Sequence, residues 1–190
     1  LRAAYGESGN QPQFGQKFTQ LNSGNVSGIS SFRIQGTAGA PGIKPERQRE
    51  IEGGIDATLF GSRASIEATV YEKKITDLLL QRTLAPSEGF STQIFNAAAM
   101  RTRGLELGLS VLPIQRSGLQ WNSRANFFLS RSKVTKLPIP GFSVGNINRG
   151  AIRIAPDSSP TQLIGYDSLP DGTRLTKIVA DATPDFHLGW

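Results

Sequence analysis

Four carboxylates are the residues of this sequence best placed to do catalytic chemistry. They fall on the polar positions of three strands that we expect to be neighbours: Glu52, Asp56, Glu67 and Glu106. Two carboxyl groups held close together can act as a general acid and a general base. We expect a structural role instead, in salt bridges with Arg124, Lys73 or a group outside this segment.

Other catalytic and metal-binding chemistries lack the residues that they need. The 190-residue chain has no Cys and one His, His187, so a thiolate site, a paired-His metal site and a Ser-His-Asp triad are not expected. The glycine-rich stretch Gly36–Gly42 has no GxGxxG and no P-loop lysine. The net charge is +6, but the basic residues are scattered and no nucleic-acid motif accompanies them. We therefore expect no enzyme, no cofactor and no nucleic-acid partner.

Alternation of apolar and polar residues runs through most of the chain and predicts an all-β fold. After the turn at Gly61-Ser62, one strand runs far beyond the five or six residues, roughly, that are usual in soluble proteins. No apolar stretch is long enough for a transmembrane helix. We predict six strands, at about Leu1–Gly6, Pro45–Phe60, Arg63–Leu80, Met100–Val111, Leu119–Leu137 and from Asp185 onward.

The connections between these strands alternate in length: long, short, long, short, long. Alternate connections of an antiparallel meander lie at the same end, so all the long loops are expected at one end. Outer-membrane barrels combine short periplasmic turns with longer extracellular loops. We therefore predict an antiparallel meander that forms part of a transmembrane β-barrel wall. The alternative is a soluble β-sandwich, such as an adhesin or a carbohydrate-binding module, whose apolar face is its core.

In a barrel, the two faces of each strand meet different surroundings. We expect the lumen to be faced by Glu52, Asp56, Glu67, Glu106, Asn122 and Arg124. Lipid is expected to contact Ile55, Leu59, Ile66, Val70, Leu107, Leu109, Trp121 and Phe127. Toward the long loops the lipid-side positions turn basic, at Arg47, Arg49, Lys74, Arg101, Arg103, Arg131 and Lys133. We expect this basic collar to contact lipopolysaccharide phosphates; the alternative is a set of solvated strand ends.

Four stretches resemble motifs of TonB-dependent outer-membrane receptors, most closely the SusC/RagA-like branch. They are "LRAAYGESGNQP", "IKPERQREIEGGIDATLFGSRASIEATVYEKKITDLLL", "IFNAAAMRTRGLELGLSVLPI" and "TPDFHLGW". The resemblance covers most of the chain except the loop interiors. It implies a barrel of about 22 strands with a plug inside, and uptake driven by energy from TonB.

The resemblance also implies that residues 1–190 are part of a longer barrel domain, in its C-terminal half, without the plug, the TonB box or the chain ends. The expected location is the bacterial outer membrane. The expected partners are the TonB complex, through the missing N-terminal part, membrane lipid, and a surface lipoprotein. The expected cargo is a bulky nutrient, either a glycan oligomer or a peptide; a siderophore or vitamin receptor of the same fold is the alternative.

Substrate contact is expected from the long loops, because loops on a rigid scaffold usually carry recognition. These loops are predicted at Glu7–Lys44, Gln81–Asn96 and Pro138–Pro184. Their aromatic candidates for stacking on a sugar ring are Phe90, Phe95, Phe142 and Tyr166. The alternative is that these loops only shield the mouth of the barrel.

Overall fold

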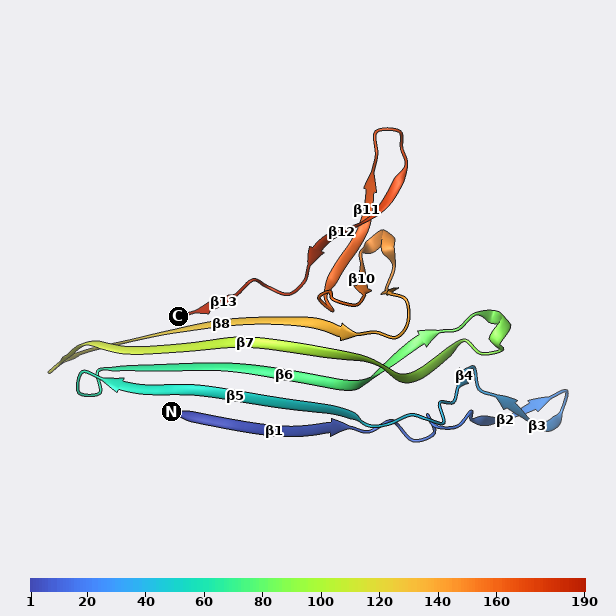
Figure 1. The fold of residues 1–190 in the computed structure, drawn as a ribbon, viewed down its shortest axis with the longest axis horizontal. Helices are drawn as coiled ribbons and strands as arrows, with labels where there is room; N and C mark the ends of the chain where they lie inside the picture. The colour runs from blue at the N-terminus through green and yellow to red at the C-terminus, as the bar shows by residue number, and fades with distance from the viewer.

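The computed structural model describes residues 1–190 and confirms an all-β fold. Six strands form a continuous antiparallel wall in the order β1-β5-β6-β7-β8-β13. Their bounds are β1 Arg2–Asn10, β5 Glu46–Leu59, β6 Ala64–Thr83, β7 Thr92–Arg116, β8 Leu119–Lys136 and β13 His187–Gly189. The predicted pairing of consecutive long strands is confirmed, and the wall stays open because β1 and β13 do not pair with each other (Figure 1). None of its helices has the length and the apolar character needed to cross a membrane.

The long connections contain further strands at the end of the wall opposite the short turns (Figure 1). A hairpin and a short parallel strand precede β5: β2 Leu21–Val26, β3 Ile29–Ile34 and β4 Thr37–Ala38, which pairs with β7. A separate four-stranded sheet stands off the wall between β8 and β13: β9 Phe142–Val144, β10 Ala151–Ile154, β11 Gln162–Ser168 and β12 Arg174–Asp181. Two single 3₁₀ turns complete the elements, η1 Pro86–Glu88 and η2 Ile147–Arg149.

Two irregularities make β6 and β7 longer than predicted. Asp77 adopts a positive φ of 55°, and the β6–β7 pairing shifts there before it resumes from Leu78 to Thr83. Much of the predicted loop Gln81–Asn96 is therefore strand. Near the short-turn end of β7, Pro113 lies in a bulge between Val111 and Ile114. Proline has no backbone N–H, and in a bulge no hydrogen bond between the paired strands is lost for that reason. The strand continues through it, so the β7–β8 turn is only Ser117-Gly118 rather than the longer predicted turn.

The wall exposes its apolar face, which is the reverse of a soluble sheet. Ile51 is 63% exposed, Val70 58% and Leu188 64%, while only ten residues of the chain are buried. The largest cluster of buried residues contains just Ala98, Val134 and Leu137, where the outer sheet meets the wall. The alternation that predicted the strands is thus real, but no part of this chain covers their apolar side.

A glycine and a tyrosine fit together on the polar face of the wall. Tyr71 lies directly opposite Gly104, and a Cβ at Gly104 would come within 2.3 Å of the Tyr71 ring. The ring therefore lies over the glycine backbone, and its hydroxyl donates to Ser130 Oγ at 3.4 Å. This contact links β6, β7 and β8 through one side chain.

We predict that Gly104→Ala destabilises the intact barrel by about 1–3 kcal/mol, because the methyl group displaces the Tyr71 ring. The control is Gly53→Ala, since a Cβ at Gly53 meets nothing within 4 Å. Heat-dependent loss of the folded gel band in the full-length receptor measures the difference. Equal midpoints for the two variants would contradict the packing role, and adding Tyr71→Ala to Gly104→Ala should remove the clash.

Candidate functional site: the two faces of the wall and its outer loops

The six residues predicted to face the lumen share the polar face of the wall. Register places Asp56 opposite Glu67 and Thr69 opposite Glu106. Ser110 lies opposite Arg124 and its hydroxyl donates to Asn122 Oδ1 at 3.5 Å. Glu52 lies opposite Tyr71, the residue that covers Gly104. The structure therefore brings these residues together on one side, while the lumen itself remains a prediction.

The expected salt bridges of this face do not form as predicted. Asp56 pairs with Arg2 at 3.7 Å, and Lys73 pairs with Glu50 at 3.2 Å rather than with any of the four carboxylates. Glu52, Glu67 and Glu106 have no cationic group within 4.0 Å. The cause is the register, which places no Lys or Arg directly opposite them. Their cross-strand neighbours are Ala4 and Tyr71 for Glu52, Asp56 and Gly108 for Glu67, and Thr69 and Phe128 for Glu106.

A hollow of about 350 Å³ lies among these free carboxylates. Glu67 and Glu106 line it together with Arg2 and Asn126, and Gly108 leaves room for it. No group of three or more metal-binding side chains is present. The arrangement offers carboxylate acceptors to a cationic or amide-bearing surface, as a neighbouring protein segment would present.

Six of the predicted basic residues lie in two rows on the opposite face of the wall. We call each row a rung, because its residues lie directly opposite one another across neighbouring strands. The first rung runs across β5, β6, β7 and β8: Arg49, Lys74, Arg101 and Lys133. The second rung, two residues nearer the short turns, runs Ile51, Glu72, Arg103 and Arg131. Arg47 lies one step beyond the first rung, opposite Thr76. All seven predicted collar residues therefore share one face and almost one height.

Carboxylates that the sequence analysis did not include pair with most of these cations. Glu72 contacts both Lys74 at 2.8 Å and Arg103 at 2.6 Å. Arg49 pairs with Glu7 of β1 at 3.3 Å. Two pairs join β8 to the connection that follows it: Arg131–Asp185 at 2.8 Å and Lys133–Asp157 at 3.0 Å. Arg47 and Arg101 have no carboxylate within 4.0 Å. The collar is thus a belt of ion pairs with two free guanidinium groups.

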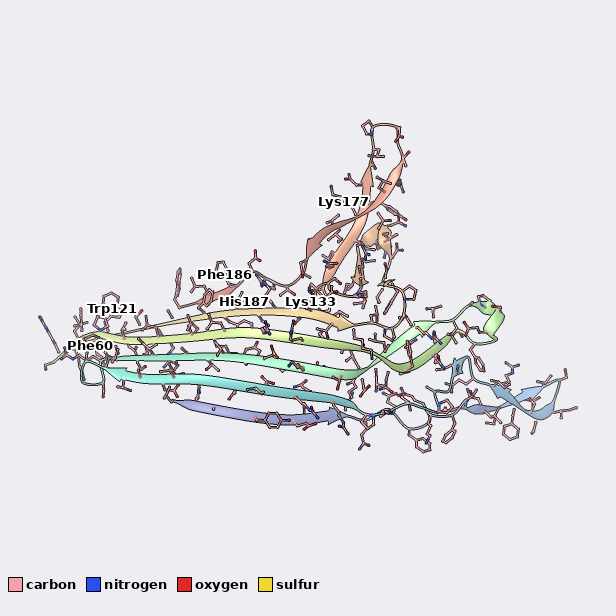
Figure 2. All side chains as sticks on the ribbon, in the orientation of Figure 1. Phe60, Trp121, Lys133, Lys177, Phe186 and His187 are labelled. Carbon is pink, nitrogen blue, oxygen red and sulfur yellow. The ribbon has the colours of Figure 1, made fainter.

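An apolar band fills the space between this belt and the short turns. Phe60 and Trp121 lie at the short-turn end, and Lys133 lies much farther along β8 (Figure 2). From Trp121 to Arg131 the strand rises by about 33 Å at about 3.3 Å per residue. A tilt of about 40° reduces this to a height of about 25 Å, which is the height of the apolar band of an outer-membrane barrel.

The four aromatic candidates for substrate contact are not brought together. Phe95 lies in β7 with the Arg82 guanidinium 4.9 Å from its ring centre, and Phe90 lies in the short loop before β7. Phe142 packs against the cluster of Ala98, Val134 and Leu137. Tyr166 lies in β11, and the guanidinium carbon of Arg174 lies 5.7 Å from the centre of its ring.

Two other phenylalanines form a more open surface that the sequence analysis missed. Phe14 is fully exposed and Phe18 is 68% exposed, and they line a groove of about 510 Å³ with Pro12, Lys17 and Ile43. The groove lies where β1 and β5 leave the wall, at the long-loop end. The signal was available in "QPQFGQKF", where two aromatic residues and a proline interrupt a polar loop.

Polar contacts hold the part of the outer sheet that lies away from its buried residues Ala151 and Ile164. Asp181 accepts hydrogen bonds from the Thr161 hydroxyl at 2.6 Å and from the Thr183 N–H at 2.9 Å. These donors hold the pKa of Asp181 below its ordinary value of 3.8. On the same hairpin, the Lys177 ammonium lowers the pKa of Asp167, to which it donates at 3.0 Å (Figure 2).

The family model described as "TonB dependent receptor-like, beta-barrel" matches residues 1–175. TonB-dependent receptor P3 of Formosa agariphila is 24% identical over 236 residues; the match covers all of this chain and 23% of that receptor. Receptor P26 of the same organism is 27% identical, and the match covers 72% of this chain and 14% of that receptor. The chain thus spans less than a quarter of the length of these relatives.

Among solved structures, the RagAB peptide transporter matches 99% of this chain with a TM-score of 0.78 and 21% identity. The RagAB peptide importer in the open-open state matches 97% with a TM-score of 0.73 and 22% identity. This chain covers 24% and 23% of those two chains. At these identities the likeness shows a shared fold.

We predict that the outer sheet loosens when the pH falls below about 4. The pKa of Asp181 and of Asp167 is lowered on folding, so their contribution is present above the unfolded value of 3.8 and is lost as the pH falls through the folded value. The loosening is measured as the protection of the β11–β12 amides from hydrogen exchange in the full-length receptor. Asp181→Asn should weaken the pH dependence. Protection that stays constant from pH 6 to pH 3 would contradict the assignment.

Proposed function

Because this chain belongs to the TonB-dependent receptor β-barrel family, we propose that it is a stretch of barrel wall from an outer-membrane transporter that imports a bulky nutrient with energy delivered through TonB. The observation that carries this proposal is the inverted wall, which exposes its apolar face and gathers its carboxylates on the other. A soluble sandwich would need a second sheet over that apolar face, and residues 1–190 place none there.

The apolar face of this wall is suited to contact with lipid. Each Val, Leu or Ile side chain taken out of water gains about 1.5–3 kcal/mol, and the face carries a continuous series of them, among them Ile55, Val70, Leu107 and Leu109. Backbone groups in hydrocarbon must all be paired, so a spanning sheet has to close. The open edges at β1 and β13 would accordingly pair with further strands of the full-length protein.

The cargo we propose is a peptide or a glycan oligomer. A peptide is supported by the RagAB structures, which are described as a peptide transporter and importer. The exposed Phe14 and Phe18, beside Lys17, offer an apolar and cationic surface to either cargo at the long-loop end. The TonB complex would act through the N-terminal part of the full-length protein, and a surface lipoprotein, implied by the SusC/RagA resemblance, would lie over the outer loops.

The orientation can be tested by labelling single cysteines, because this segment contains no Cys of its own. We predict that Asp171→Cys, in the outer β11–β12 turn, reacts with a membrane-impermeant maleimide on intact cells. Ser62→Cys and Ser117→Cys, in the short turns, should react only after the outer membrane is permeabilised. Labelling of Ser62→Cys on intact cells to the same extent as Asp171→Cys would contradict the proposed orientation.

Uptake tests the aromatic surfaces. We predict that Phe14→Ala with Phe18→Ala lowers uptake of a labelled peptide or glycan digest about tenfold at limiting concentration, at about 0.5–1.5 kcal/mol per lost aromatic contact. Phe60→Ala, at the short-turn end, is the matched control. A second variant with alanine at Phe90, Phe95, Phe142 and Tyr166 tests the four aromatic residues predicted from the sequence, in the same assay. Unchanged uptake in both multiple variants would remove aromatic stacking from the proposal.

A further inference from the structure

The first basic rung is electrostatically unfavourable within this chain. Lys74, Arg101 and Lys133 lie directly opposite one another on β6, β7 and β8. Like charges in directly opposite positions of a sheet destabilise it. Unless an anion lies between them, the three cations repel one another across neighbouring strands.

The carboxylates of the chain relieve this repulsion at the sides of the rung but not at its centre. Lys74 contacts Glu72, and Lys133 contacts Asp157 on the outer segment. Arg101 lies between them, with Arg103 two residues along its own strand and no carboxylate within 4.0 Å. Arg103 in turn shares Glu72 with Lys74. The centre of the belt is therefore a cationic position that the chain leaves open.

The surroundings of Arg101 define the anion that would fit. Below it, on the same face and toward the short turns, Leu105 and Leu107 begin the apolar band, and Leu129 lies opposite Leu105. A ligand with its anionic group at Arg101 would place any attached apolar chain on this band. Two negative charges on a compact phosphate match the cations on either side better than a single carboxylate does.

We propose that Arg101, flanked by Lys74, Lys133 and Arg103, binds a phosphate of lipid A in the outer leaflet, with the acyl chains along the apolar face of β7 and β8. A free phosphate would satisfy the cations but would leave the apolar band unused. The proposal rests on the outer-membrane location proposed above and is independent of the cargo, so a failed uptake test leaves it standing.

The test uses the full-length receptor, purified in neutral detergent, with Arg101→Gln as the variant. Lipid A retained per receptor is measured by mass spectrometry after incubation with diphosphorylated lipid A. We expect about fivefold less retention for Arg101→Gln, the size of effect expected for one cation at an anionic membrane surface. Arg124→Gln is the matched control, since it removes the same charge from the opposite face of the neighbouring strand. Arg101→Lys should retain most of the lipid, because it keeps the positive charge at this position.

Three outcomes would overturn the proposal. Equal retention by Arg101→Gln and the wild-type receptor would mean that the free guanidinium does not bind the lipid. Equal retention of dephosphorylated lipid A would mean that the apolar band alone holds it. Release of lipid A by millimolar inorganic phosphate, at constant ionic strength, would assign the site to free phosphate. Loss of retention at high salt in the wild-type receptor is the expected companion result.

Discussion

An apolar sheet face without a protein core is the constraint on which the rest of this structure depends. Successive side chains of a strand point to opposite faces, so the register that pairs Ile66 with Leu109 also pairs Glu67 with Gly108. A shift of one residue would bring carboxylates to the apolar side along a whole strand. The register therefore decides which face meets which surroundings: water suits the face with the carboxylates, whereas the apolar face needs lipid.

The same constraint sets the height at which the wall changes character. Below the belt the exposed side chains are aliphatic, and Phe60 and Trp121 mark the short-turn end. At the belt, cations appear on four neighbouring strands in aligned positions. Most of them are neutralised by Glu7, Glu72, Asp157 and Asp185. Glu7 joins β1 to β5, and Asp157 and Asp185 join the connection between β8 and β13 to β8. The belt thus serves the assembly of the wall first, and its open centre at Arg101 is what remains for a ligand.

Sequence reasoning predicted the wall well because alternation is a property of each strand by itself. The sharing of faces follows from it, whereas the order of the long strands was predicted from the alternating loop lengths and the family from the four resembling stretches. It failed where structure depends on contacts between distant residues. The bulges at Asp77 and Pro113 lengthen β6 and β7 in ways that alternation does not signal, and the outer sheet lies in sequence rich in glycine, proline and polar residues. The partners of the collar were missed because Asp157 and Asp185 reach it from the connection between β8 and β13.

The most direct test of the account is a nitroxide scan of residues 64 to 71 of β6 in the full-length receptor, reconstituted in lipid. Collision rates with molecular oxygen, which partitions into lipid, and with a water-soluble nickel complex would be measured at each position. If the apolar face meets lipid, both rates alternate with period two, with oxygen maxima at Ile66, Ala68 and Val70 and weaker oxygen contact at Ser65, Glu67 and Thr69. Nickel contact that is highest at Ile66 and Val70 would contradict it, because the apolar face would then meet water.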